Sequence, residues 1–128
     1  MELQYLAWSA LLCVIMAVPY ATGLTLKLGL PRMAGNRDDV PDMPEGWMGR
    51  AKRAHRNMVE NLIPFAALVL VAAATNKLGG LAATGALLFF WARVAYALVY
   101  YAGIPYARTA AWAVGVVGTV LVFIRICS

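Results

Sequence analysis

The chain has 128 residues, of which 62% are hydrophobic and 13% are charged, and its formal net charge is +5. Its mean hydropathy of +0.70 is too high for a soluble domain and its length allows one compact unit, so the composition predicts a small integral membrane protein. The positive charge lies mostly beside apolar segments, where it indicates orientation and headgroup contact and argues against a nucleic-acid partner.

The first predicted membrane helix covers residues 3–26, an apolar run without a charge. We do not expect a signal peptide here, because the run is too long, lacks a basic start and has no evident small-residue cleavage site. Residues 27–47 follow as a polar loop. The three aspartates of this loop, Asp38, Asp39 and Asp42, lack the spacing and the following glutamate of a calcium site, so no metal is expected.

Three further apolar runs predict helices at about 48–76, 79–101 and 107–126. Each can reach the roughly 20 residues that cross a hydrocarbon core of ~30 Å. The small-residue runs GGLAATGA (79–86) and AVGVVG (113–118) are typical of close contacts between membrane helices. The sequence therefore predicts an all-α membrane protein, a single four-helix transmembrane domain.

The basic residues predict the orientation of this bundle. Seven of the eleven Lys and Arg residues lie between positions 27 and 56, whereas the N-terminus carries none. By the positive-inside rule, the first loop is cytoplasmic and both termini lie on the other side. The short loops and compact length favour a bacterial protein, and hence the inner membrane.

Polar residues recur at one depth on three of the predicted helices. Glu60 and Arg93 each lie about 25 Å from Lys77 along two antiparallel helices, which predicts an ion pair between them. The second helix carries a polar stripe at i, i+3, i+4 and i+7, and the third a stripe at i, i+3 and i+7. The members of this layer are Arg53, Arg56, Asn57 and Glu60, then Arg93, Tyr96 and Tyr100, and finally Arg108 at the start of the last helix.

This layer holds more positive charge than one glutamate can neutralise. It therefore forms either a clamp between helices or a site for a small polar anion that enters from the cytoplasm. Guanidinium groups bind carboxylates, an asparagine can hold a peptide group, and tyrosines donate hydroxyl protons; a phospholipid phosphate also fits. His55 lies beside the stripe and is expected to contact headgroups, while Cys13 and Cys127 are expected to be inert thiols.

Two motifs, RAHRNMVENLIPF (53–65) and ARVAYALVYYAGIPYAR (92–108), resemble the membrane-associated proteins in eicosanoid and glutathione metabolism, the MAPEG family. The resemblance covers the whole chain. It implies a homotrimer with glutathione sites between subunits, and a glutathione-dependent transferase or peroxidase that acts on a hydrophobic electrophile or lipid hydroperoxide from the bilayer.

The resemblance also implies roles for single residues. Residues matching the stripe bind glutathione, and Arg108 stabilises the glutathione thiolate, which makes it the catalytic candidate. Tyr96 stands where prostaglandin E synthases have a histidine, so the leukotriene-forming branch is the nearer one, and Met58 replaces an aspartate found in several members. The glutathione-binding candidates are Arg53, Arg56, Asn57, Glu60, Arg93, Tyr96 and Tyr100.

Two other functions remain open at this point. A non-catalytic scaffold of the same family would bind lipid or an anion through the same layer, although it would have no need to keep the whole stripe. A small transporter is less favoured, because the charges cluster in one leaflet and not at the midplane.

Overall fold

The computed structural model describes residues 1–38, 40 and 46–128. Asp39 and Asp42 of the polar loop therefore lie outside the described residues. The described chain forms five helices: α1 (Glu2–Leu28), α2 (Leu30–Ala34), α3 (Gly46–Ala74), α4 (Leu81–Ala102) and α5 (Pro105–Cys127). α1, α3, α4 and α5 are each long and apolar enough to cross a membrane. This confirms the prediction of an all-α membrane protein with four transmembrane helices.

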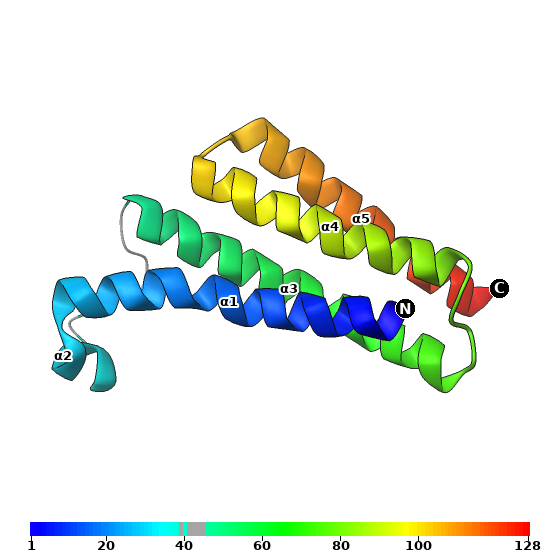
Figure 1. The fold of residues 1–128 in the computed structure, drawn as a ribbon, viewed down its shortest axis with the longest axis horizontal. Helices are drawn as coiled ribbons and strands as arrows, with labels where there is room; N and C mark the ends of the chain where they lie inside the picture. The colour runs from blue at the N-terminus through cyan, green and yellow to red at the C-terminus, as the bar shows by residue number, and fades with distance from the viewer. Residues whose placement is uncertain (39, 41–45) are drawn as a thin grey trace.

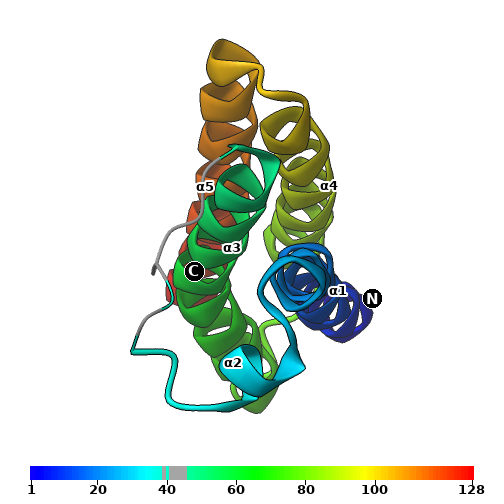
Figure 2. The ribbon, with the colours of Figure 1, turned by 90° about the vertical axis from the view of Figure 1, so that its left-hand side faces the viewer.

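The four long helices alternate in direction, so the chain enters and leaves at the same end of the bundle (Figure 1). Their ends differ by one or two residues from those read in the sequence. The short helix α2 was not anticipated; it lies within the segment 27–47, which the sequence analysis treated as a loop. The end view shows α1 beside α3 and α4, with α5 on the other side of that pair (Figure 2).

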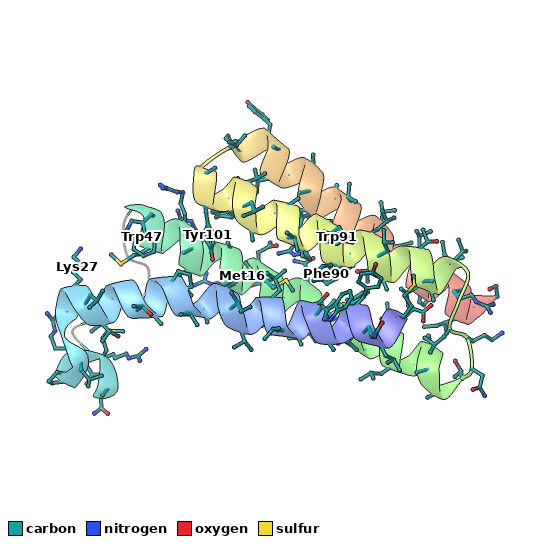
Figure 3. All side chains as sticks on the ribbon, in the orientation of Figure 1. Met16, Lys27, Trp47, Phe90, Trp91 and Tyr101 are labelled. Atoms are coloured by element: carbon teal, nitrogen blue, oxygen red, sulfur yellow. The ribbon has the colours of Figure 1, made fainter. Side chains whose placement is uncertain are left out.

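The main apolar core lies mostly between α3 and α4, and Met16 of α1 and Val122 of α5 complete it. Phe65 of α3 stacks on Phe89 of α4, with ring centroids 3.9 Å apart, and both side chains are fully buried. Near the start of α1, Tyr5 and Trp8 pack on Phe90 of α4 (Figure 3). These contacts fix α1 and α3 against α4, and so they set the position of the polar residues further along each helix.

Small residues bring α4 and α5 closest together. A Cβ atom on Gly118 of α5 would lie 2.5 Å from the carbonyl oxygen of Gly85 and 2.9 Å from the amide nitrogen of Phe89. Neither glycine could therefore be replaced without separating the helices. The runs GGLAATGA and AVGVVG contain these two glycines, and the close contact read from the sequence lies there.

Glu2 lies at the end of the bundle opposite the polar layer. Its side chain is buried, and Oε1 accepts a hydrogen bond from the backbone N–H of Gly79 at 2.9 Å. This bond ties the start of α1 to the turn between α3 and α4.

Candidate functional site

Polar side chains from α3, α4 and α5 meet where α3 begins, α4 ends and α5 begins. Gly103 makes this junction tight, because it ends α4 in the left-handed conformation with φ 79° and its N–H bonds to the carbonyl of Tyr100. Pro105 then starts α5, which places Arg108 in the first turn of that helix. The N-terminus of a helix stabilises a nearby negative charge, and so does the guanidinium of Arg108. Both would therefore stabilise an anion at this junction.

Arg93 of α4 is the most deeply buried charge of the layer, with 1% of its surface exposed. Its Nη2 donates a hydrogen bond of 2.8 Å to Oδ1 of Asn57 on α3, and its guanidinium lies 4.2 Å from the ring centroid of Tyr96. Gly115 of α5 packs beside it, and a Cβ there would lie 3.6 Å from Cδ of Arg93, an ordinary van der Waals distance. Two of its nitrogens, Nε and Nη1, have no hydrogen-bond partner among the described residues.

The expected ion pair between Glu60 and Arg93 is wrong. The salt bridges found among the described residues do not include it, and Asn57 takes the place that Glu60 was predicted to fill. The prediction used depth along the helix axis alone. Rotation about the axis of α3 decides the contact: Asn57 is half-buried toward α4, whereas Glu60 is exposed.

Tyr100 joins the other members of the layer. Its hydroxyl oxygen accepts a hydrogen bond of 3.1 Å from Nε of Arg53, and the Arg108 guanidinium lies 4.8 Å from its ring centroid. Its ring also packs against that of Tyr96, with centroids 5.5 Å apart. A single aromatic side chain therefore connects cations from two other helices.

Two cavities open on either side of Tyr100 and Arg108. The larger, of about 290 Å³, is lined by Asn57, Tyr96, Tyr100, Arg108, Thr109 and Trp112. The smaller, of about 140 Å³, is lined by Arg50, Arg53, Tyr100 and Arg108 together with residues 103–105. Both cavities combine guanidinium and hydroxyl donors with apolar walls, an arrangement suited to a polar anion with an apolar part.

The structure brings together most, but not all, of the site residues read from the sequence. Arg53, Asn57, Arg93, Tyr96, Tyr100 and Arg108 are connected by contacts or by shared cavity walls. Arg56 and Glu60 are exposed, and within the described part of the chain no hydrogen bond or ion pair joins either of them to this group. In a single copy of the chain neither residue lines either of these two cavities.

Six residues of the cavity walls were not predicted from the sequence: residues 103–105 at the junction, and Arg50, Thr109 and Trp112 on the helices. Arg50 lies one turn before Arg53 on the same helix face, so its spacing gave a signal, but it was counted with the basic residues that set orientation. Thr109 and Trp112 lie within one turn of Arg108 on α5. Neither position stood out in the sequence, because Thr and Trp are both common in membrane helices.

His55 differs from its predicted role as a headgroup contact. It is half-buried, and it faces α1, where its ring nitrogens contact Tyr20 and Cys13. It therefore lies on a different side of α3 from the cavities that Tyr100 and Arg108 share.

Fold and site together define a multi-pass, all-α membrane protein with an arginine- and tyrosine-lined site between its helices. The model of the MAPEG family matches residues 3–128, so the chain belongs to the MAPEG family. Comparisons with curated proteins and with solved structures give no match. Membership of this family supports a glutathione-related role in the membrane, of the transferase or peroxidase type.

Proposed function

We propose that this protein is a glutathione-dependent membrane transferase or peroxidase. It converts the thiol of glutathione to a thiolate and directs it at lipophilic electrophiles or lipid hydroperoxides. The observation that carries this proposal is the junction at Tyr100, where Arg53 bonds the hydroxyl, Arg108 lies over the ring, and the two cavities meet.

Glutathione fits the chemistry of these cavities. It carries two carboxylates, which guanidinium groups bind in bidentate fashion, and peptide groups, which Asn57 can hold. The unpaired nitrogens of Arg93 add donors that are buried and lack an acceptor, and a buried cation without an anion is costly. An anion bound nearby would offset this cost.

Arg108 is the residue that we assign to thiol activation. A free thiol has a pKa of about 8.5. A neighbouring positive charge lowers this pKa because it stabilises the thiolate. Arg108 borders both cavities and stands at the positive end of α5, so a thiol placed between them would feel both effects.

Two reactions follow from a thiolate in this position. Attack on an electrophilic carbon forms a thioether and expels the leaving group, or, with an epoxide, opens the ring to an alcohol. With a lipid hydroperoxide, two glutathione molecules give the disulfide, the lipid alcohol and water. In either case we propose that glutathione comes from the cytoplasm and that the electrophile or hydroperoxide comes from the bilayer. The protein would act as a homotrimer in the inner membrane, with both termini on the non-cytoplasmic side.

The test is a titration of the purified protein in detergent with glutathione at neutral pH, following the ultraviolet absorbance of the thiolate. We expect a saturable thiolate signal. Arg108→Leu should bind glutathione within a few-fold of the original affinity, measured by calorimetry, while its thiolate signal falls about tenfold or more as the thiol returns to its ordinary pKa. Equal thiolate signals in the two proteins would remove Arg108 from the mechanism.

The alternative is a non-catalytic, lipid- or anion-binding scaffold of the same family. The bond between Arg93 and Asn57 favours it, because a buried charge held by another helix can serve packing alone. Saturable binding of glutathione without any thiolate signal, or binding of phosphate-headgroup lipid in place of glutathione, would favour the scaffold over the enzyme.

A further inference from the structure

Three polar side chains meet on the side of α3 that faces α1, away from the proposed glutathione site. Sγ of Cys13 lies 3.8 Å from Nε2 of His55, and Nδ1 of the same ring lies 3.1 Å from the hydroxyl of Tyr20. Cys13 and Tyr20 come from α1, and His55 comes from α3. A thiol, an imidazole and a group that orients the imidazole are the parts of an activated nucleophile.

We infer that Cys13 is a nucleophilic thiol that lipophilic α,β-unsaturated carbonyl compounds modify covalently, with His55 as the base and Tyr20 as the residue that orients it. This site is separate from the proposed glutathione chemistry and needs no glutathione. It revises the sequence-based expectation that Cys13 is inert, because the packing of α1 on α3 places His55 beside the thiol.

The contacts of the His55 ring fit a tautomer in which it can act as a base. When Nδ1 carries the proton, it donates to the Tyr20 oxygen, and the lone pair of Nε2 faces the Cys13 thiol. In an apolar environment a thiol stays protonated unless a neighbouring base takes its proton. His55 is the group placed to do so, whereas Cys127, near the end of α5, is exposed and has no such neighbour among the described residues.

The modification balances without an oxidant or a further reactant. The thiol proton passes to Nε2 of His55 while sulfur forms a bond to the β-carbon of the unsaturated carbonyl. The electron pair of the carbon–carbon double bond moves to the α-carbon, which takes a proton back from His55. The product is a thioether adduct that contains every atom of the thiol and of the electrophile.

The surroundings favour an electrophile that arrives through the lipid. Cys13 is half-buried, and its neighbours Val14 and Ile15 are exposed on the surface of a helix that would face lipid. An apolar pocket of about 170 Å³ is lined by Pro19, Trp47, Ala51 and Tyr101, so its walls include the residue before Tyr20 and the residue one turn before His55. Trp47 and Tyr101 lie toward the end where α3 begins (Figure 3), and the apolar walls of the pocket suit the tail of a lipophilic electrophile.

The test uses the intact protein in lipid vesicles, free of added thiols, and a long-chain enal such as nonenal. Mass spectrometry of the peptides gives the rate of adduct formation at Cys13 and at Cys127 in the same molecules. In His55→Gln, which keeps a polar side chain but loses the base, we expect the Cys13 rate to fall about 10²-fold. The Cys127 rate should not change, which makes it an internal control for reagent and fold.

Two further variants separate nucleophile activation from simple access. Tyr20→Phe keeps the ring and loses the hydroxyl, so the Cys13 rate should fall by a smaller factor. The combined change Cys13→Ser and Leu12→Cys moves the thiol one position around the helix, to another half-buried site, and it should react as slowly as Cys13 in His55→Gln. Equal Cys13 rates in the original protein and in His55→Gln would overturn the inference. If His55→Gln does not fold, equal Cys13 rates in the original protein and in Tyr20→Phe would overturn it.

Discussion

At the scale of single residues, the most informative contact is the bond from Arg93 to Asn57. A neutral amide accepts a hydrogen bond from a buried guanidinium, so the positive charge stays uncompensated within the described residues. A carboxylate in the same place would neutralise the charge and satisfy the arginine. The amide therefore keeps Arg93 oriented without neutralising its charge.

Replacing Asn57 should reveal this division of roles. Asn57→Leu removes the acceptor of a buried charged group, and we expect the free energy of unfolding in detergent to fall by about 1.5–3 kcal/mol. Asn57→Asp supplies a carboxylate partner, so it should keep the stability but weaken the binding of anionic ligands. Unfolding followed by circular dichroism and calorimetry with glutathione measure the two effects.

A double-mutant cycle gives the control for this prediction. Arg93→Met removes the charge and keeps an apolar side chain of similar length, so Asn57→Leu should cost much less stability in that background. Equal costs in the two backgrounds would mean that the bond between the two side chains contributes nothing to stability.

At the scale of elements, the contact between α4 and α5 sets the geometry of the proposed site. The close approach of Gly118 and Gly85 fixes how α5 lies on α4, and Arg108 and Tyr100 are positioned by the same two helices. In a bilayer such packing depends on small residues, because lipid offers apolar surface as good as that of another helix.

Gly118→Ala should separate these helices. Its new methyl group would overlap backbone atoms of Gly85 and Phe89, which cannot move as a flexible side chain can. We expect a loss of about 1–3 kcal/mol in the free energy of unfolding, together with weaker glutathione binding. Val117→Ala, at an exposed position beside it, is the matched control and should change little. Unchanged stability in Gly118→Ala would show that α4 and α5 do not pack this closely.

At the scale of the whole molecule, the charges of Arg56 and Glu60 need explanation. Both are exposed on α3 in a single chain, and charges inside a membrane cost about 2.5–3.5 kcal/mol each on insertion scales unless they meet protein or water. A neighbouring copy of the chain would cover this face and could use the two residues to complete a shared site, as the proposed trimer requires.

Native mass spectrometry from detergent tests this assembly. We expect three copies of the chain, and we expect the combined change Arg56→Ala and Glu60→Ala to lower the trimer fraction. Lys77→Ala, in the turn between α3 and α4, serves as the control and should leave it unchanged. A monomer, or a trimer unaffected by the loss of both charges, would contradict this role for the α3 face.

The sequence by itself determined the membrane class, the four helices and most of the polar layer. Apolar runs of membrane-spanning length and residues repeated every three or four positions follow directly from the chain, because helix geometry converts spacing into length and face. The motifs around Arg53 and Tyr100 were enough to suggest the family, which the match over residues 3–128 establishes.

Only the tertiary structure decided which side chains meet. Depth along an axis placed Glu60 level with Arg93, but the rotation of each helix about its own axis gave that contact to Asn57. The same rotation turned His55 toward Cys13 and Tyr20, and it brought Arg50 into a cavity with Arg108. Rotation is set by packing against neighbouring helices, through contacts such as Phe65 on Phe89, and these distant pairings leave no periodic signal in the chain.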